Sequence, residues 1–285
     1  MRYAKPKSLD EAIALLGDGS WRLIAGGTDF YPAQGTRPIR DDVLDLNALD
    51  ELRGISETHT HYVFGARTSW SEIAAARHLS PAFEALRMAA REVGSIQVQN
   101  TGTIAGNLCN ASPAADGVPP LLVLDAEVEL RSASGVRHLP VGGFILGNRV
   151  TARRQDELVT AIRVPKAAVK GRSHFVKLGA RRYLVISIAM AAVRVVGDAS
   201  GRIEEAAIAV GACSPVAKRI AGLEAAMKGA APGELEALIA QYPFDELQPI
   251  DDVRATADYR RQAAREIVGR AVLASLREDT GRAAA

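Results

Sequence analysis

The densest run of ligand-binding residue types extends from Thr101 to Asp116, with the sequence TGTIAGNLCNASPAAD. Glycine lets main-chain N–H groups approach a ligand without a Cβ in the way. Asn, Ser and Thr add short, orientable hydrogen-bond partners, and the Asp116 carboxylate can accept from hydroxyl groups. The stretch therefore predicts a backbone that lies against a polar ligand, although an ordinary surface loop of turn-forming residues has a similar composition.

A second glycine turn lies near the N-terminus. A short apolar segment, residues 21–25, runs into Gly26-Gly27-Thr28-Asp29. A strand that ends in two glycines and a threonine is a usual shape for an anion-binding turn, because several N–H groups can point at one phosphate. It is neither a GxGxxG motif nor a P-loop, since no Gly-Lys-Ser/Thr follows. Taken alone, the turn indicates a tight connection as readily as a ligand site.

Composition limits the class of protein. A chain of 285 residues is long enough for about two domains with separate cores. Its 48% hydrophobic and 24% charged residues are ordinary for a soluble globular protein, and a net charge of +2 gives no case for a nucleic-acid partner. No run reaches the roughly 18 apolar residues that a membrane span needs, and the N-terminus has no apolar signal region. We therefore expect a soluble protein without a membrane span.

The cysteines and histidines argue against a metal site. Cys109 and Cys213 lie far apart and form no CxxC pair, so they supply neither a disulfide framework nor enough ligands for an iron–sulfur cluster. This usage favours a reducing, cytoplasmic setting. His59 and His61 alternate on a predicted strand, but without a third ligand in the sequence the pattern favours solvent exposure over metal binding.

Capping signals and periodicity predict the elements that must position the two glycine turns. We expect helices over residues 9–16, 70–78, 81–93, 216–228, 233–241 and 252–277. We expect strands over residues 21–25, 43–46, 62–64, 126–131, 137–141, 158–164, 175–178, 181–190, 191–196 and 206–210. Residues 166–173 are basic and form the best candidate for a linker. Strands followed by helices in the second half predict an α+β domain.

In their order and spacing, these motifs resemble one family. The chain resembles the FAD-binding medium subunit of molybdenum hydroxylases, the group that includes xanthine dehydrogenase and aerobic carbon monoxide dehydrogenase. The resemblance is near full-length and strongest at TGTIAGN (101–107) and SPAAD (112–116). It also covers residues 25–29, 157–165, 177–182, 210–215 and 252–260. Each matching segment is weak evidence by itself, but all of them together, in this order, are specific for the family.

The resemblance implies an α+β fold with two parts. Residues 1–165 would form a two-part FAD-binding domain of the PCMH type, with subdomains at about 1–55 and 56–165. Residues 174–280 would form a C-terminal flavoprotein domain, an antiparallel sheet with helices, that covers the flavin. No residue would be catalytic in its own right, because the flavin carries the redox chemistry.

The resemblance also implies a set of FAD-binding residues. The turn Ala25, Gly26, Gly27, Thr28 and Asp29 would bind the pyrophosphate through backbone N–H groups. The phosphate, ribityl and ribose region would be lined by Thr103, Gly106, Asn107, Asn110, Ser112 and Asp116. Leu158 or Val159 would lie near the adenine or isoalloxazine. Lys177 and the Arg181-Arg182 pair would lie in the segment that approaches the flavin from the second domain.

The chain departs from the family pattern in two places. Val185 and Ile186 stand where the family often has an acidic residue and an aromatic or aliphatic one, so that Tyr183 becomes a candidate to cover the flavin. Ala105 stands where a second glycine is common, and because methyl is the smallest addition we expect the site to survive.

The resemblance favours an electron-transfer subunit. FAD would take electrons from iron–sulfur centres on a partner and pass them to an acceptor such as NAD or oxygen. The implied partners are a molybdenum-cofactor large subunit and a 2Fe-2S small subunit, in a heterotrimer or its dimer. The basic residues Lys166, Lys170, Arg172, Arg181 and Arg182 would attract an anionic acceptor or simply form a solvated surface.

Two alternatives stay open at this point. A self-sufficient FAD-dependent oxidoreductase would act directly on a small molecule and would need an acid or base, for which Tyr183, His174 and Lys177 are candidates. A flavin-free assembly subunit would use the glycine turns only as scaffold.

Overall fold

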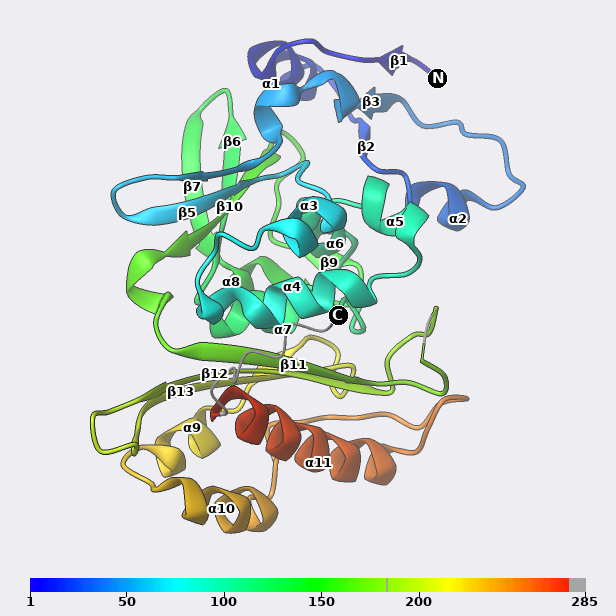
Figure 1. Ribbon diagram of the computed structural model, residues 1–285. Coiled ribbons are helices and arrows are strands. Elements are labelled where there is room, and N and C mark those ends of the chain that lie inside the picture. The colour runs from blue at the N-terminus through cyan, green and yellow to red at the C-terminus, as the bar shows by residue number, and fades with distance from the viewer. Residues whose placement is uncertain (183, 277–285) are drawn as a thin grey trace, which may run out of the picture.

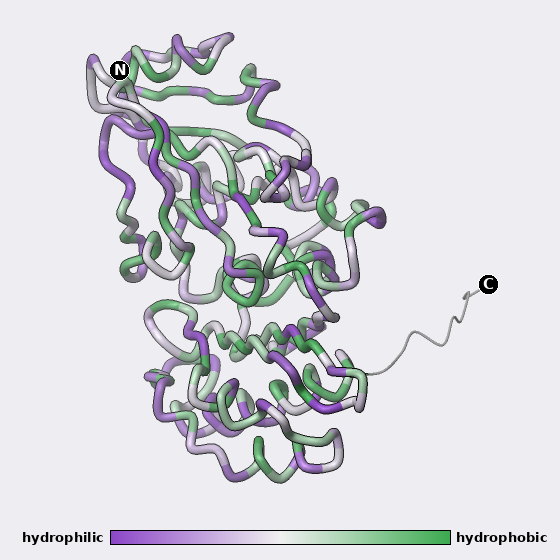
Figure 2. The backbone as a smooth tube through the Cα atoms, turned by 90° about the vertical axis from the view of Figure 1, so that its left-hand side faces the viewer, coloured by the Kyte–Doolittle hydropathy of each residue, from purple (hydrophilic) through white to green (hydrophobic). Residues whose placement is uncertain are grey.

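In the computed structural model of the chain, residues 1–182 and 184–276 are described. The chain forms two bodies that pack against each other (Figure 1). The first carries the N-terminus, and the second is a sheet backed by α9, α10 and α11. Figure 2, turned by 90°, shows the same two bodies with the N-terminus at the outer end of the first. The expected α+β fold class is confirmed.

A small parallel sheet opens the first body, with strand order β1-β3-β2. Its strands are β1 (Tyr3–Ala4), β2 (Arg22–Ile24) and β3 (Val43–Asp45), with α1 (Leu9–Gly17), α2 (Phe30–Gln34) and the 3₁₀ turns η1 (Leu46–Ala48) and η2 (Asp50–Leu52) between and after them. The helix predicted over 9–16 is confirmed, and Ser8 caps it by accepting from the Glu11 N–H at 3.3 Å. Because β2 ends at Ile24, the glycine turn begins where this sheet stops.

The second part of the first body is a five-stranded antiparallel sheet with order β4-β5-β10-β6-β7. These strands are β4 (Ile55–Glu57), β5 (His61–Gly65), β6 (Glu127–Ser132), β7 (Gly135–Pro140) and β10 (Leu158–Pro165). The predicted hairpin of residues 126–131 with 137–141 is confirmed as β6 and β7. The central strand β10 is mostly buried, in agreement with its largely apolar sequence.

Short helices connect and cover this sheet. They are α3 (Trp70–Ala75), η3 (Pro81–Phe83), α4 (Glu84–Glu92), α5 (Ile96–Thr101), α6 (Ile104–Asn110), α7 (Val118–Val123) and α8 (Val141–Phe144), and the small hairpin β8 (Ile145–Gly147) and β9 (Val150–Thr151) follows. Within the glycine-rich stretch 101–116, residues 104–110 are therefore helical. The stretch combines a helix with turns, whereas its composition alone suggested irregular backbone throughout.

The second body is an antiparallel sheet, β11-β12-β13-β14, with helices on one face. Its elements are η4 (Lys166–Ala168), β11 (Arg172–Leu178), β12 (Ala189–Gly197), β13 (Ile203–Gly211), β14 (Lys218–Arg219), α9 (Ala221–Met227), η5 (Pro232–Glu234), α10 (Leu235–Gln241) and α11 (Ala257–Leu276). One face packs on α9 and α11, and the other packs on α4 and α7 of the first body (Figure 1). Met190 and Ala192 belong to the core shared with the first body, whereas Ala191 and Val193 face the helices.

The helix predicted over 216–228 begins only at Ala221, after the short strand β14, and two further boundaries predicted in the second body are also wrong. The run 181–190 was predicted as strand, but β12 begins only at Ala189 and Leu184 has a left-handed backbone, with φ of 51°. The last helix was predicted from residue 252, but it begins at Ala257, because residues 252–255 form a turn closed by the Asp252 carboxylate. In both places apolar or helix-forming residues occur in a segment that tertiary hydrogen bonds hold in another conformation.

His174 on β11 makes stability depend on pH. Burial lowers the pKa of its imidazole below the ordinary value of 6.5, and the nearby Glu84 opposes this only partly. Because the folded pKa lies below the unfolded one, the native state disfavours the charged ring, and stability falls as pH falls through about 6.5 towards the folded pKa. We expect a shallower loss of the urea midpoint between about pH 8 and pH 5 in H174Q than in wild type. Equal pH dependence in the two chains would contradict this.

Candidate functional site

A cleft of about 1020 Å³ runs through the first body. One wall is the end of β2, the glycine turn and the start of α2, and the other includes α6, the β8–β9 hairpin and the start of β10. Ligand pockets in proteins are usually about 300–1,000 Å³, so this cleft has room for a ligand at the large end of that range.

The glycine turn forms one edge of the cleft, and its backbone lies very close to the backbone at Thr101. A Cβ on Gly26 would lie 1.9 Å from the Thr101 carbonyl oxygen, so only glycine fits there. Gly27 has a φ of 71°, which L side chains rarely adopt. Among the described residues, the N–H groups of Gly26, Gly27 and Thr28 find no acceptor in the protein. Three unbonded amides in a row fit an anionic group of a ligand.

The first amides of helix α6 already have partners within the protein. The helix therefore offers side chains, and not these amides, to a ligand in the cleft. The N–H groups of Ile104 and Ala105 donate to the carbonyls of Thr68 and Ala66, at 3.0 and 3.2 Å. The Gly106 N–H donates to the Thr103 hydroxyl at 3.1 Å, the ordinary N-cap arrangement. Asn107 lines the cleft, and its Oδ1 atom is buried without a hydrogen-bond partner among the described residues. A buried acceptor of this kind can accept from a donor of a bound molecule or of an ordered water.

Five arginines also line the cleft, and no sequence pattern had marked them as site residues. They are Arg22, Arg40, Arg67, Arg149 and Arg153. They come from separate parts of the first body, so neither a motif nor a spacing connects them. Their guanidinium groups give the cleft a positive lining that favours an anionic ligand.

Cys109 is the cysteine that lines the cleft. The protein atoms around it raise the pKa of its thiol to about 11 by desolvation, although its side chain faces open space. The thiol is therefore protonated near neutral pH, and a nucleophilic role would need the thiolate.

The structure brings most of the sequence-predicted binding residues to this cleft. Those that line it are Ala25, Gly26, Gly27, Thr28, Asp29, Thr103, Gly106, Asn107, Asn110, Leu158 and Val159. Ser112, Asp116 and Lys177 lie outside its lining. The predicted Tyr183 lies outside the described residues.

Asp116 and Lys177 meet each other where the two bodies join. Lys177 Nζ on β11 lies 2.8 Å from Asp116 Oδ2, and their side chains are 7% and 11% exposed. The buried Ser187 hydroxyl donates to Asp116 Oδ1 at 3.2 Å. Burial raises the pKa of the Asp116 carboxyl, while Lys177 and Ser187 lower it. This contact ties the segments on either side of residues 179–186 to the first body.

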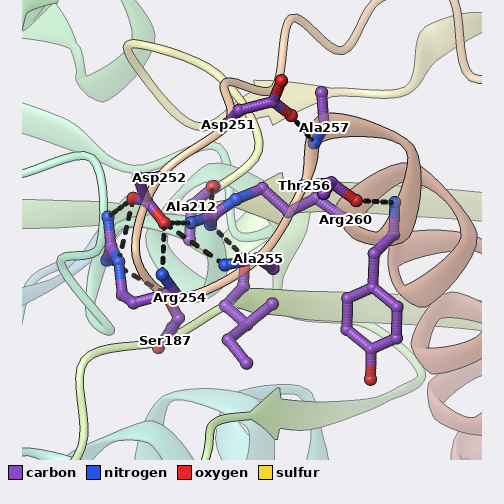
Figure 3. A network of polar contacts seen from close by, with 11 residues as sticks. Ser187, Ala212, Asp251, Asp252, Arg254, Ala255, Thr256, Ala257 and Arg260 are labelled. Atoms are coloured by element: carbon purple, nitrogen blue, oxygen red, sulfur yellow. Dashed lines mark hydrogen bonds and ion pairs between the residues drawn. The ribbon is translucent and has the colours of Figure 1, made fainter.

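An arginine–aspartate network holds the same segment from the other side (Figure 3). Asp252 accepts from Arg254 at 2.5 Å and from the buried Arg260 at 2.6 Å. These guanidinium groups, Arg254 first, hold the pKa of Asp252 far below its usual range. Arg254 also donates to the Ser187 carbonyl at 3.3 Å, and Arg260 to the Ile188 carbonyl at 2.6 Å. The end of the segment that precedes β12 is thus anchored by charge-assisted hydrogen bonds.

The departures at Val185 and Ile186 lie in this anchored segment. Val185 packs closely on Gly179, since a Cβ there would lie 2.5 Å from Val185 Cγ1. Leu184 and Ile186 are exposed. Two hydrogen bonds from the Arg181 guanidinium to the Leu184 carbonyl close the turn.

Searches for two other kinds of site gave no candidate. In residues 1–182 and 184–276, no three or more His, Cys, Asp or Glu side chains come together in a way that could hold a metal ion. Residues 1–182 and 184–276 contain no helix with the length and hydrophobicity that a membrane span requires.

Comparisons with known proteins identify the family. Residues 1–167 match the FAD binding domain in molybdopterin dehydrogenase, and residues 174–275 match the CO dehydrogenase flavoprotein C-terminal domain. The chain is 31% identical over 278 residues to the carbon monoxide dehydrogenase medium chain of Hydrogenophaga pseudoflava, with 96% of each chain covered. It is 28% identical to the xanthine dehydrogenase FAD-binding subunit of Escherichia coli O157:H7, again with 96% of each covered.

The fold agrees with a solved relative. A structure of the Hydrogenophaga pseudoflava carbon monoxide dehydrogenase, which lacks the Mo-pyranopterin moiety of its molybdenum cofactor, superposes with a TM-score of 0.85 at 31% identity, covering 96% of each chain. The unbonded amides of the glycine turn and the unpartnered Asn107 Oδ1 fit a large ligand with phosphate and polar groups. The chain belongs to the FAD-binding medium subunits of the molybdenum hydroxylase family, and FAD is its cofactor.

Proposed function

We propose that this chain is the FAD-carrying electron-transfer subunit of a multi-subunit molybdenum hydroxylase. In this function it receives electrons from iron–sulfur centres on a partner and passes them by way of FAD to an acceptor such as NAD or oxygen. Bound FAD supplies the redox chemistry, because its ring accepts and releases electrons singly or in pairs. The observation that carries the proposal is the row of unbonded amides at Gly26, Gly27 and Thr28 on the edge of a large cleft.

The chain's own residues would bind and orient the cofactor. The amides of Gly26, Gly27 and Thr28 would donate to the pyrophosphate. Asn107 Oδ1 would accept a hydrogen bond from the ligand, and its burial makes that bond worth more than one in water. Leu158 and Val159, both buried, would give a planar ring an apolar wall. The second body would cover the flavin. We propose that three residues contact the cofactor from the place where the two bodies meet: Ser112, Asp116 and Lys177.

Neither Lys177 nor His174, the two candidates among the described residues, is placed to act as an acid or base at the cleft. Lys177 is bound by Asp116 and the Glu92 carbonyl, and His174 is half-buried on β11 away from the cleft lining. A flavoenzyme that transforms a small molecule directly would need such a group next to the ring. This favours electron transfer over a self-sufficient oxidoreductase.

The partners and the domain boundary are also proposals. We infer a molybdenum-cofactor large subunit and a 2Fe-2S small subunit as partners, in a heterotrimer or its dimer, because the named relatives are medium chains and FAD subunits. We infer a cytoplasmic location from the cysteine usage. The division of the chain near residues 166–173 is supported by two family matches that end at residue 167 and begin at residue 174.

The first test is the visible spectrum of the purified chain before and after acid release of any cofactor. We expect flavin absorption, with FAD recovered at about one per chain. A colourless chain that also fails to take up added FAD would contradict the proposed function. If FAD is bound, partner subunits that co-purify from the native source would identify the iron–sulfur and molybdenum centres. Recovery of the flavoprotein with no such partner would contradict the electron-transfer assignment.

A further inference from the structure

The arginines that line the cleft differ in whether their guanidinium groups donate hydrogen bonds to protein oxygens. Arg22, Arg67 and Arg153 donate hydrogen bonds of 2.7–2.8 Å to protein oxygens. Asp41 and Asp42, which line the cleft beside Arg40, pair with Arg22 and Arg2, so Arg40 keeps its donors available. The Arg149 guanidinium forms no hydrogen bond with the described residues, and its ion-pair partner Asp29 Oδ1 lies 4.0 Å away, beyond hydrogen-bond distance. Arg149 therefore keeps its donors available to a ligand.

The backbone fixes the position of Arg149. It lies in the turn between β8 and β9 with a φ of 62°, a left-handed conformation that few non-glycine residues adopt. Its N–H donates at 3.0 Å to the carbonyl of Ala111, which caps α6 and is itself left-handed, with φ of 47°. A strained position held by a specific hydrogen bond often marks a functional constraint.

The placement of Asp29 shows what lies opposite Arg149. Asp29 directly follows Thr28, the last of the three residues whose amides are unbonded, so Arg149 faces the glycine turn from the other wall of the cleft. The side chains of Arg149 and Asp29 are 55% and 56% exposed, and an exposed ion pair at this distance contributes little. A guanidinium can exchange such a contact for a phosphate, which it binds with charge-assisted hydrogen bonds.

We propose that Arg149 binds the diphosphate of FAD from the wall opposite the glycine turn, giving up its weak contact with Asp29 to do so. The diphosphate would then be held on one side by the amides of the glycine turn and on the other by the Arg149 guanidinium. This inference rests on the proposed function, since it assumes that FAD occupies the cleft. Arg149 acts in cofactor binding and takes no part in electron transfer.

The test is the affinity of the flavin-free full-length chain for FAD, measured by fluorescence titration at low and at high salt. The variant is R149N, because asparagine tolerates the left-handed backbone. We expect FAD binding about 10- to 100-fold weaker at low salt. We also expect a shallower salt dependence, since the removed interaction is an ion pair with phosphate.

Two further variants separate charge from structure. R154N makes the same charge change at an exposed residue that does not line the cleft, and it should bind FAD as wild type does. R149K keeps the positive charge and should restore most of the salt dependence.

The outcomes are distinguishable. Wild-type affinity in R149N would overturn this inference alone, as would weaker binding with an unchanged salt dependence. A wild-type chain that takes up no FAD would overturn the proposed function and this inference with it.

Discussion

A chain in which Gly26 is replaced by alanine is expected to lose most of its affinity for FAD, and about 1–3 kcal/mol of its free energy of unfolding. The added Cβ would lie 1.9 Å from the Thr101 oxygen, 2.5 Å from its carbonyl carbon and 3.0 Å from Gly102 Cα. All three atoms are backbone, so no side chain can rotate away. The glycine turn must therefore move away from the α5–α6 connection, and its unbonded amides move with it.

The measurement is FAD affinity together with thermal unfolding of the flavin-free chain. G143A is the matched control, because a Cβ at Gly143 would meet nothing within 4 Å and its backbone is not left-handed. The control should match wild type in both measurements. A G26A chain with wild-type affinity and stability would show that the two backbones can separate without cost, contrary to their close packing in the structure.

The parts of the fold that the sequence predicts well are those with local signals. The Ser8 cap, the β6–β7 hairpin and the glycine turn after β2 each follow from neighbouring residues. Of these, the glycine turn also belongs to the family resemblance, which identified the cofactor together with the fold. β12 was also recognised, since burial on both faces of its sheet requires a continuous apolar strand.

The parts that escaped prediction depend on contacts between distant residues. Arg149 belongs to a short hairpin whose only local signal is the Gly147-Asn148 turn, and its place opposite the glycine turn follows from packing. The same holds for residues 252–255, where Arg254 and Arg260 close on Asp252 and prevent the helix from starting earlier. Propensity describes a residue's local preference, and tertiary hydrogen bonds override it here.

The pairing of Asp116 with Lys177 shows the same limit most clearly. The two residues are 61 positions apart and come from different bodies. Each was expected at the cofactor through the resemblance, but their contact with each other could be found only once the two bodies were packed together. The contact also supplies a test of how firmly those bodies are joined.

Replacement of Lys177 by alanine is expected to cost about 3–5 kcal/mol of the free energy of unfolding, because it leaves the Asp116 carboxylate buried without its cation. K166A is the matched control, since Lys166 pairs with Glu57 at 2.5 Å on the surface, where both side chains are at least a third exposed. An exposed pair contributes about 0–1 kcal/mol, so the control should unfold near wild type. Urea unfolding of the two variants measures the difference.

The pH dependence of K177A distinguishes an uncompensated charge from a packing defect. Without the ammonium group the folded-state pKa of Asp116, already raised by burial, rises further above its unfolded value. The cost of burying the carboxylate is then present above the unfolded pKa and disappears as pH falls through the folded pKa, where the group is protonated. The deficit of K177A relative to wild type should therefore shrink towards acid pH, and the D116N/K177A double variant should recover part of it at neutral pH. A deficit that is the same at every pH, or no larger than that of K166A, would mean that the two bodies are held together by apolar packing and that this ion pair contributes little to the join.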